Sequence, residues 1–249
     1  MNSLNKEGEV SGLVLSVIEY KDRDGIVKLA KEDEIVSVFA RGIQIPSSKN
    51  ARLCQPYSKV TLEYDPKYSR DMLYLIKGTL DYSSAHVQDD LEIQTLCQII
   101  SQLIEYRGIN PAIYRHLEKM WLKFDGSDRN GGFLQAAYLL AELCRKEGIE
   151  PYVKSCVECG RTDQIEALDF SAGGLVCKEH RPAQVKPWPK KRMQQLVALI
   201  RSKGAHEDYL EDNFNWDAPW ILLMLDWISW HLDLQLPSIE FFRTVSHMK

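Results

Sequence analysis

Four residues in the second half of the chain have the types and the spacing of a metal site. Two residues separate Cys156 from Cys159, two separate Cys177 from His180, and seventeen lie between the pairs. Two ligands at this spacing reach one ion from a tight turn, and a second pair completes a tetrahedron of the thiolate and imidazole ligands that Zn²⁺ prefers. Because four protein ligands leave no position for a substrate, the sequence predicts a structural zinc ion.

Three other interpretations of this cluster remain open at the level of sequence. Cys156 and Cys159 could form a redox dithiol, although such a motif usually lies beside a βαβ pattern, which we do not find here. His180 could be an ordinary surface histidine, which would leave three ligands. A zinc hydrolase, the third possibility, would need an open coordination position.

Other catalytic motifs are missing from the sequence. We find no GxxxxGK[ST], GxSxG, HExxH or GxGxxG pattern, so we predict no enzymatic activity. Residues 1–9 carry no apolar core, so we expect no secretory signal and a cytoplasmic protein with reduced cysteines. The most apolar stretch, residues 221–234, is shorter than the ~20 residues that span a bilayer, so we expect a buried helix and no membrane contact.

The elements that must position the metal cluster begin with a β-rich region. The chain has 249 residues, of which 45% are hydrophobic and 27% charged, as in soluble globular proteins. Short segments rich in β-branched residues suggest a small closed barrel, with the OB-fold as the leading candidate; they are residues 12–20, 26–30, 35–40, 60–64 and 72–77. Periodicity alone does not separate this fold from an SH3-like barrel.

From residue 84 onward, apolar residues recur at helical spacing, and residues 152–183 interrupt this pattern. Asn110-Pro111 and Asp217 mark helix starts, and Gly131-Gly132 precede another helix. The predicted fold class is α+β, with an N-terminal OB-fold β-barrel followed by an α-helical domain that contains an inserted zinc knuckle. The predicted domains are 1–80 for the barrel, 81–152 and 184–249 for the helical domain, and 153–183 for the insert.

Positive charge is concentrated in two regions of a chain whose formal net charge is -4. Residues 153–192 hold 8 Lys and Arg against 5 Asp and Glu, and residues 1–80 hold 12 against 11, while the helical segments are acidic. A barrel that binds single strands needs cations for phosphates and aromatic rings for bases. Candidate phosphate contacts are Lys21, Arg23, Lys28, Arg41, Lys49, Arg52, Lys190, Lys191 and Arg192. Candidate rings are Tyr20, Phe39 and Tyr57. Scattered lysines on a barrel are more often part of a solvated face, and Tyr or Phe in strands more often belongs to the core.

Several segments, in order, resemble the RecO family of bacterial recombination mediators. They are residues 12–29, Ala40-Arg41-Gly42, residues 46–49, Leu53-Cys-Gln-Pro56, residues 156–160, residues 170–177 with His180, and residues 236–243. The match spans most of the chain.

The resemblance implies an OB-fold, a helical domain and a zinc knuckle. It also implies a protein of the bacterial cytoplasm and nucleoid that binds single- and double-stranded DNA and anneals complementary strands. Its partners would be RecR, single-strand-binding protein and, indirectly, RecA, which it helps to load. The alternative is a zinc-stabilised protein-interaction scaffold without nucleic-acid binding, which the net acidity favours.

Overall fold

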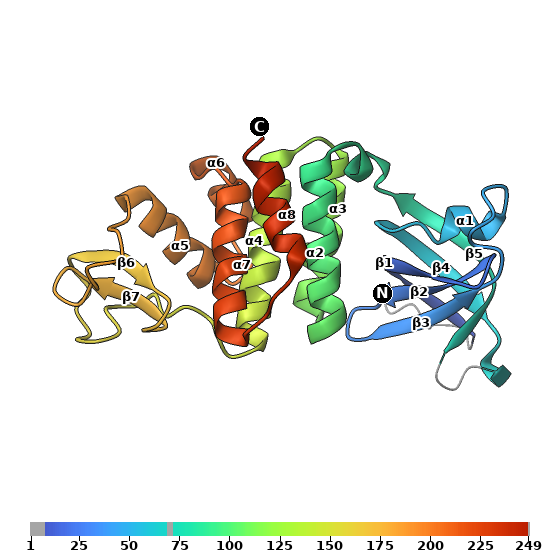
Figure 1. Cartoon of the computed structure of the whole chain (residues 1–249), viewed down its shortest axis with the longest axis horizontal. Coiled ribbons are helices and arrows are strands. Elements are labelled where there is room, and N and C mark those ends of the chain that lie inside the picture. The colour runs from blue at the N-terminus through green and yellow to red at the C-terminus, as the bar shows by residue number, and fades with distance from the viewer. Residues whose placement is uncertain (1–7, 69–71, 249) are drawn as a thin grey trace. The chain divides into compact units, whose positions relative to one another are not determined.

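Five strands close into a barrel in the computed structural model, which describes residues 8–68 and 72–248 (Figure 1). They are β1 (Glu9–Tyr20), β2 (Asp24–Ala30), β3 (Ile35–Ala40), β4 (Ser58–Tyr64) and β5 (Leu73–Ser83). Their order is β1-β2-β3-β5-β4, with β4 returning to β1, and β3 runs parallel to β5. This closed five-stranded barrel confirms the OB-fold prediction. Residues 1–7, to which the expectation of no secretory signal largely refers, lie outside the described residues.

The barrel interior is built from alternate residues of each strand, and a bulge in β1 resets the alternation. Val14 pairs with Leu29 and Val17 with Val27, so one extra residue, Leu15, is inserted in β1. Before the bulge the even-numbered residues face the interior, and after it Val17 does, which turns Ser16, Ile18 and Tyr20 outward.

Two helices pack outside the barrel and complete the first of two compact units. These are α2 (Leu91–Arg107) and α3 (Pro111–Asp125), and Asn110 caps α3 with Pro111 in its first turn, as predicted. The Tyr57 ring lies edge-on to Trp121 of α3, and Lys59 on β4 forms an ion pair with Glu118 at 2.7 Å. This unit extends to Ser127 and includes the chain from His247; it also contains α1 (Lys49–Leu53), η1 (Pro66–Tyr68) and η2 (Ala85–Asp89).

The second unit, Asp128–Ser246, is mainly helical. Its helices are α4 (Arg129–Lys146), α5 (Lys190–Ser202), α6 (Glu207–Asn213), α7 (Ala218–Leu232) and α8 (Pro237–Ser246). Asp217 caps α7 as predicted, whereas α4 starts before Gly131 and Gly132 because Asp128 accepts a hydrogen bond from the backbone of Gly131. Within the described ranges, no helix combines the length and apolar character needed to cross a membrane.

A two-stranded hairpin inserted between α4 and α5 carries the cysteine cluster. It consists of β6 (Ile165–Asp169) and β7 (Gly174–Cys177), which sequence periodicity did not predict. The local core contains four buried residues, Cys156, Ala167, Val176 and Cys177. So small a core leaves much of the stabilisation of this segment to other interactions.

The fold class is therefore confirmed as a barrel followed by a helical region with an insert. The border between the two compact units falls inside the segment 81–152, and the three predicted domain ranges stay predictions.

Candidate metal centre and nucleic-acid surface

Cys156, Cys159, Cys177 and His180 converge on one point, with their donor atoms all within 4.8 Å of one another. The Sγ atoms of Cys159 and Cys177 are 3.8 Å apart. Nδ1 of His180 lies 3.3 Å from Sγ of Cys177 and 3.9 Å from Sγ of Cys156. Three sulfurs and one imidazole nitrogen thus form a group that could hold a metal ion.

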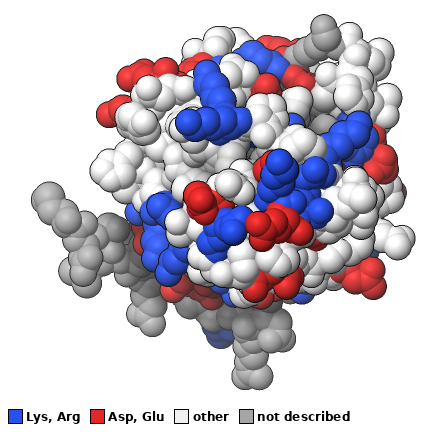
Figure 2. All heavy atoms as spheres, turned by 90° about the vertical axis from the view of Figure 1, so that its left-hand side faces the viewer, with Lys and Arg blue, Asp and Glu red and all other residues white. Residues whose placement is uncertain are grey.

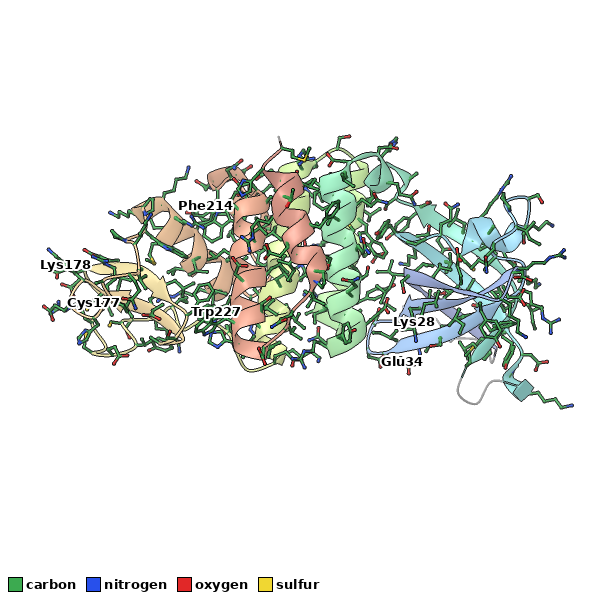
Figure 3. The ribbon with its side chains drawn as sticks, in the orientation of Figure 1. Lys28, Glu34, Cys177, Lys178, Phe214 and Trp227 are labelled. Carbon is green, nitrogen blue, oxygen red and sulfur yellow. The ribbon has the colours of Figure 1, made fainter. Side chains whose placement is uncertain are left out.

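Two short turns bring these side chains together. The backbone N–H of Gly160 donates to the carbonyl oxygen of Cys156, and that of His180 donates to the carbonyl oxygen of Cys177. Gly160 has a φ of +72°, a left-handed conformation that favours glycine. Figure 3 marks Cys177, at the end of β7, and its neighbour Lys178.

The local backbone favours the metal-binding thiolate form of Cys156 and Cys177. Burial raises the pKa of the Cys156 thiol, but backbone hydrogen bonds at Cys177, Cys159 and Glu158 outweigh it and hold the pKa below its ordinary value. The pKa of Cys177 is lowered in the same way, against burial, by backbone hydrogen bonds at His180 and Glu179.

Two of the arginines around the cluster are neutralised locally. Arg161 lies 3.0 Å from Glu179 and 3.5 Å from Asp163, and Arg181 lies 3.0 Å from Glu166. Figure 2 shows Lys and Arg side chains interspersed with Asp and Glu on the face that carries the hairpin. Among described residues of this region, Lys154, Lys178 and Lys186 are exposed and form no ion pair.

Five of the predicted barrel cations lie on two neighbouring segments. Lys21 and Arg23 are in the β1–β2 turn, and Arg41, Lys49 and Arg52 follow β3, all exposed. Gln44 joins the segments, because its backbone N–H donates to the carbonyl oxygen of Arg23 and its side-chain amide to that of Lys21. The amide of Asn50 donates to the carbonyl oxygen of Arg41.

These five residues are called the barrel cations below. In the part of the chain that the structure describes, none of them forms an ion pair with a carboxylate. Lys28, the sixth predicted cation, projects from the outer side of β2 and donates to Oγ of Ser37 at 2.9 Å (Figure 3).

The candidate rings divide into two kinds. Tyr57 is 6% exposed and packs on Trp121, so the expectation that it stacks on bases is wrong. Tyr20 and Phe39 lie on the outer side of the barrel, with ring centroids 5.9 Å apart. Tyr74 on β5 extends this cluster, 5.6 Å from Phe39, and was missed because the sequence does not show which residues of β5 face outward.

The three cations at the start of α5 differ in their surroundings. Lys190 and Lys191 are exposed in the first turn of the helix. The guanidinium of Arg192 lies 4.9 Å from the centroid of Trp188 and 5.4 Å from that of Trp220. Its Nε atom is buried without a hydrogen-bond partner in the described structure. The aromatic partners of Arg192 were not apparent from sequence, because Trp220 is distant along the chain.

The chain is similar to known proteins over most of its length. The family model described as recombination protein O C terminal matches residues 93–238, more than half of the chain. A protein of Exiguobacterium sibiricum named DNA repair protein RecO is 25% identical over 179 residues, covering 70% of each chain. Its namesake in Cutibacterium acnes is 25% identical over 244 residues, 91% of this chain and 95% of the relative.

A third relative with this name, from Lactobacillus delbrueckii subsp. bulgaricus, is 24% identical over 249 residues, 95% of this chain and 96% of its own. The similarity therefore extends from the barrel to the end of the helical region. The chain belongs to the RecO family of recombination proteins.

Proposed function

We propose that this protein is a non-enzymatic mediator of DNA repair and homologous recombination in the bacterial cytoplasm, associated with the nucleoid. It binds single- and double-stranded DNA and anneals complementary strands. With RecR it helps to load RecA onto DNA coated by single-strand-binding protein. Family membership and the names of the relatives support the repair role, and the OB-fold supports nucleic-acid binding.

The observation that carries DNA binding is the grouping of the barrel cations. Hydrogen bonds from Gln44 hold the β1–β2 turn, with Lys21 and Arg23, against the segment that follows β3. Cations without carboxylate partners are free to neutralise phosphates, and the release of counterions then drives binding. Neutralised strands repel one another less, which is how the protein would promote annealing.

Lys28, Lys190, Lys191 and Arg192 complete the proposed set of DNA contacts. Lys28 lies on the outer face of the same barrel, and Lys190 and Lys191 extend from α5 in the second unit. We also propose the division into a DNA-binding domain at 1–80, a helical domain at 81–152 and 184–249, and an insert at 153–183.

We further propose that Cys156, Cys159, Cys177 and His180 hold a structural Zn²⁺ ion. With zinc–sulfur bonds of about 2.3 Å, a tetrahedral site places two sulfurs about 3.8 Å apart. The separation of 3.8 Å between Cys159 and Cys177 fits this value. Four protein donors leave no open position, so the ion would crosslink the two turns and the hairpin without taking part in catalysis.

The test of DNA binding is the salt dependence of affinity for a labelled single strand, measured by fluorescence anisotropy. The five barrel cations should contribute about -3.5 to the slope of log affinity against log salt, because each phosphate contact on a single strand contributes about -0.7. The triple variant Arg41→Glu, Lys49→Glu and Arg52→Glu should make the slope less steep by about 2.1.

The matched control is Lys77→Glu, because Lys77 is an exposed lysine of β5 that is already paired with Glu63 at 3.1 Å. It should change the slope much less than the triple variant. Affinity that does not depend on salt, or equal losses in the control and the triple variant, would refute the proposed interface.

The alternative is a zinc-stabilised scaffold that binds proteins but no nucleic acid. The net charge of -4 and the ion pairs that neutralise Arg161 and Arg181 favour it. A mobility-shift assay at low salt separates the two functions, because the scaffold would leave the oligonucleotide unshifted.

A further inference from the structure

A row of apolar side chains crosses four neighbouring strands on the outside of the barrel. Ile18 on β1 pairs with Ile26 on β2, Ile26 with Phe39 on β3, and Phe39 with Tyr74 on β5. Neighbours in such a row are one strand spacing apart, about 4.8 Å. These four residues are called the apolar row below.

The apolar row is open to solvent at both ends and has a third ring beside it. Ile18 is 48% exposed and Tyr74 43%. Tyr20, also 43% exposed, lies edge-on to Phe39, and Phe39 in turn contacts Tyr74. Three rings from β1, β3 and β5 therefore form one partly exposed cluster, and contiguous exposed apolar patches on soluble proteins often mark binding sites.

A surface groove borders the rings on the side of Tyr74. It is lined by Phe39, Arg41, Asp65, Tyr74, Leu75 and Ile76. One of the barrel cations, Arg41, thus shares a concave surface with two of the three rings.

Cations lie on both sides of the apolar row. Nζ of Lys21 is 5.2 Å from the centre of the Tyr20 ring on one side. On the other side, Lys28 pairs across the strands with Ser16 and Ser37, in the next outward-facing row. Asp24, which pairs with Tyr20 on the Lys21 side of the row, accepts a hydrogen bond from the backbone of Gly42.

We propose that this surface stacks unpaired bases, so that the barrel selects single-stranded DNA over duplex. Rings flanked by cations match a chain that presents flat apolar bases on a repeating anionic backbone. In a duplex the bases are already stacked on one another, and only phosphates and groove edges remain for the protein to contact. The rings would therefore contribute to binding of single strands alone, whereas the cations contribute to both. This inference rests on the proposed DNA binding.

The test compares Tyr20→Ala, Tyr74→Ala and Tyr74→Leu with wild type on labelled oligothymidylate and on a labelled duplex of equal length. Each ring is expected to contribute at least about fivefold to single-strand affinity. Duplex affinity should stay unchanged. Tyr74→Phe should bind like wild type, and Tyr74→Leu like the alanine variant, because leucine is apolar but cannot stack.

The matched control is Tyr106→Ala, which removes an exposed tyrosine of α2 in the same unit. Thermal unfolding of each variant checks that the barrel remains folded, and the exposure of both target rings makes large losses of stability unexpected.

Single-strand affinity that is unchanged, that falls equally with duplex affinity, or that survives in Tyr74→Leu would overturn the inference while leaving salt-dependent DNA binding intact. The last result would point to an apolar docking site for a protein partner. A wild-type chain that binds neither DNA at low salt would overturn the proposed function and, with it, this inference.

Discussion

Replacing Arg192 by alanine should destabilise the second unit more than it weakens DNA binding. The guanidinium contacts both Trp188 and Trp220, at 4.9 and 5.4 Å from the ring centroids. Trp188 is fixed in turn, because its backbone N–H donates to the carbonyl oxygen of Glu166 on β6 at 2.6 Å. Arg192 therefore joins the linker after the hairpin to α7.

The expected magnitude follows from these contacts. A cation over an aromatic ring contributes about 0.5–2 kcal/mol, depending on how far it is desolvated, and the aliphatic part of the side chain adds packing. Because Arg192 is half-buried, we expect Arg192→Ala to lower the free energy of unfolding by about 1–3 kcal/mol. Lys190→Ala, at an exposed position two residues earlier, should change it by less than about 0.5 kcal/mol.

Urea denaturation followed by tryptophan fluorescence measures this difference, since Trp188 and Trp220 themselves report the transition. Arg192→Lys should restore the stability only in part, because an ammonium lacks the planar face that stacks on indole. An Arg192→Ala variant as stable as wild type, with DNA affinity reduced as much as in Lys190→Ala, would refute this role for Arg192.

Two further predictions concern the metal centre and pH. Removal of the proposed zinc ion by a chelator should open β6 and β7 to hydrogen exchange while α4 and α7 stay protected, because the four-residue core of the insert is too small to replace the ligand bonds. Protection of β6 that persists after chelation would contradict this. Burial lowers the pKa of His231 from 6.5, so protonation of this side chain favours the unfolded chain. The stability contributed by neutral His231 should therefore be present above pH 6.5 and be lost as the pH falls through the lowered pKa of the folded state. The His231→Phe variant should lose this part of the pH dependence in urea denaturation across that range, and an unchanged profile would show that other groups cause it.

The sequence was sufficient for features that depend on local chemistry. The ligand spacing alone identified Cys156, Cys159, Cys177 and His180, because two tight turns need little more than the right residue types at the right separation. Helix starts were predicted at Asn110-Pro111 and at Asp217, because proline in a first turn and a capping side chain act only on backbone groups a few residues away.

Features that depend on which way a strand faces could not be read from the sequence. The extra residue Leu15 in β1 reverses the alternation, so the outward position of Tyr20 follows from pairing with β2 and not from the sequence of β1. Tyr57 looked equivalent to Tyr20 in type and region, yet its contact with Trp121 on α3 buries it. The stacking of Arg192 on Trp220 likewise needs the tertiary arrangement of α5 and α7.

The parallel pairing of β3 with β5 makes the proposed base-binding surface depend on the tertiary structure of the barrel. Phe39 and Tyr74 become neighbours only when β5 pairs with β3, and all of β4 lies between them in the sequence. Pairing across such a separation in sequence is slow compared with the formation of local hairpins. A single strand held by both rings would bind only the docked arrangement, so it should stabilise the barrel by RT ln(1 + L/Kd), where L is its free concentration, and the midpoint of unfolding should rise with the logarithm of its concentration above the dissociation constant. Bound nucleic acid would then stabilise the surface that recognises it.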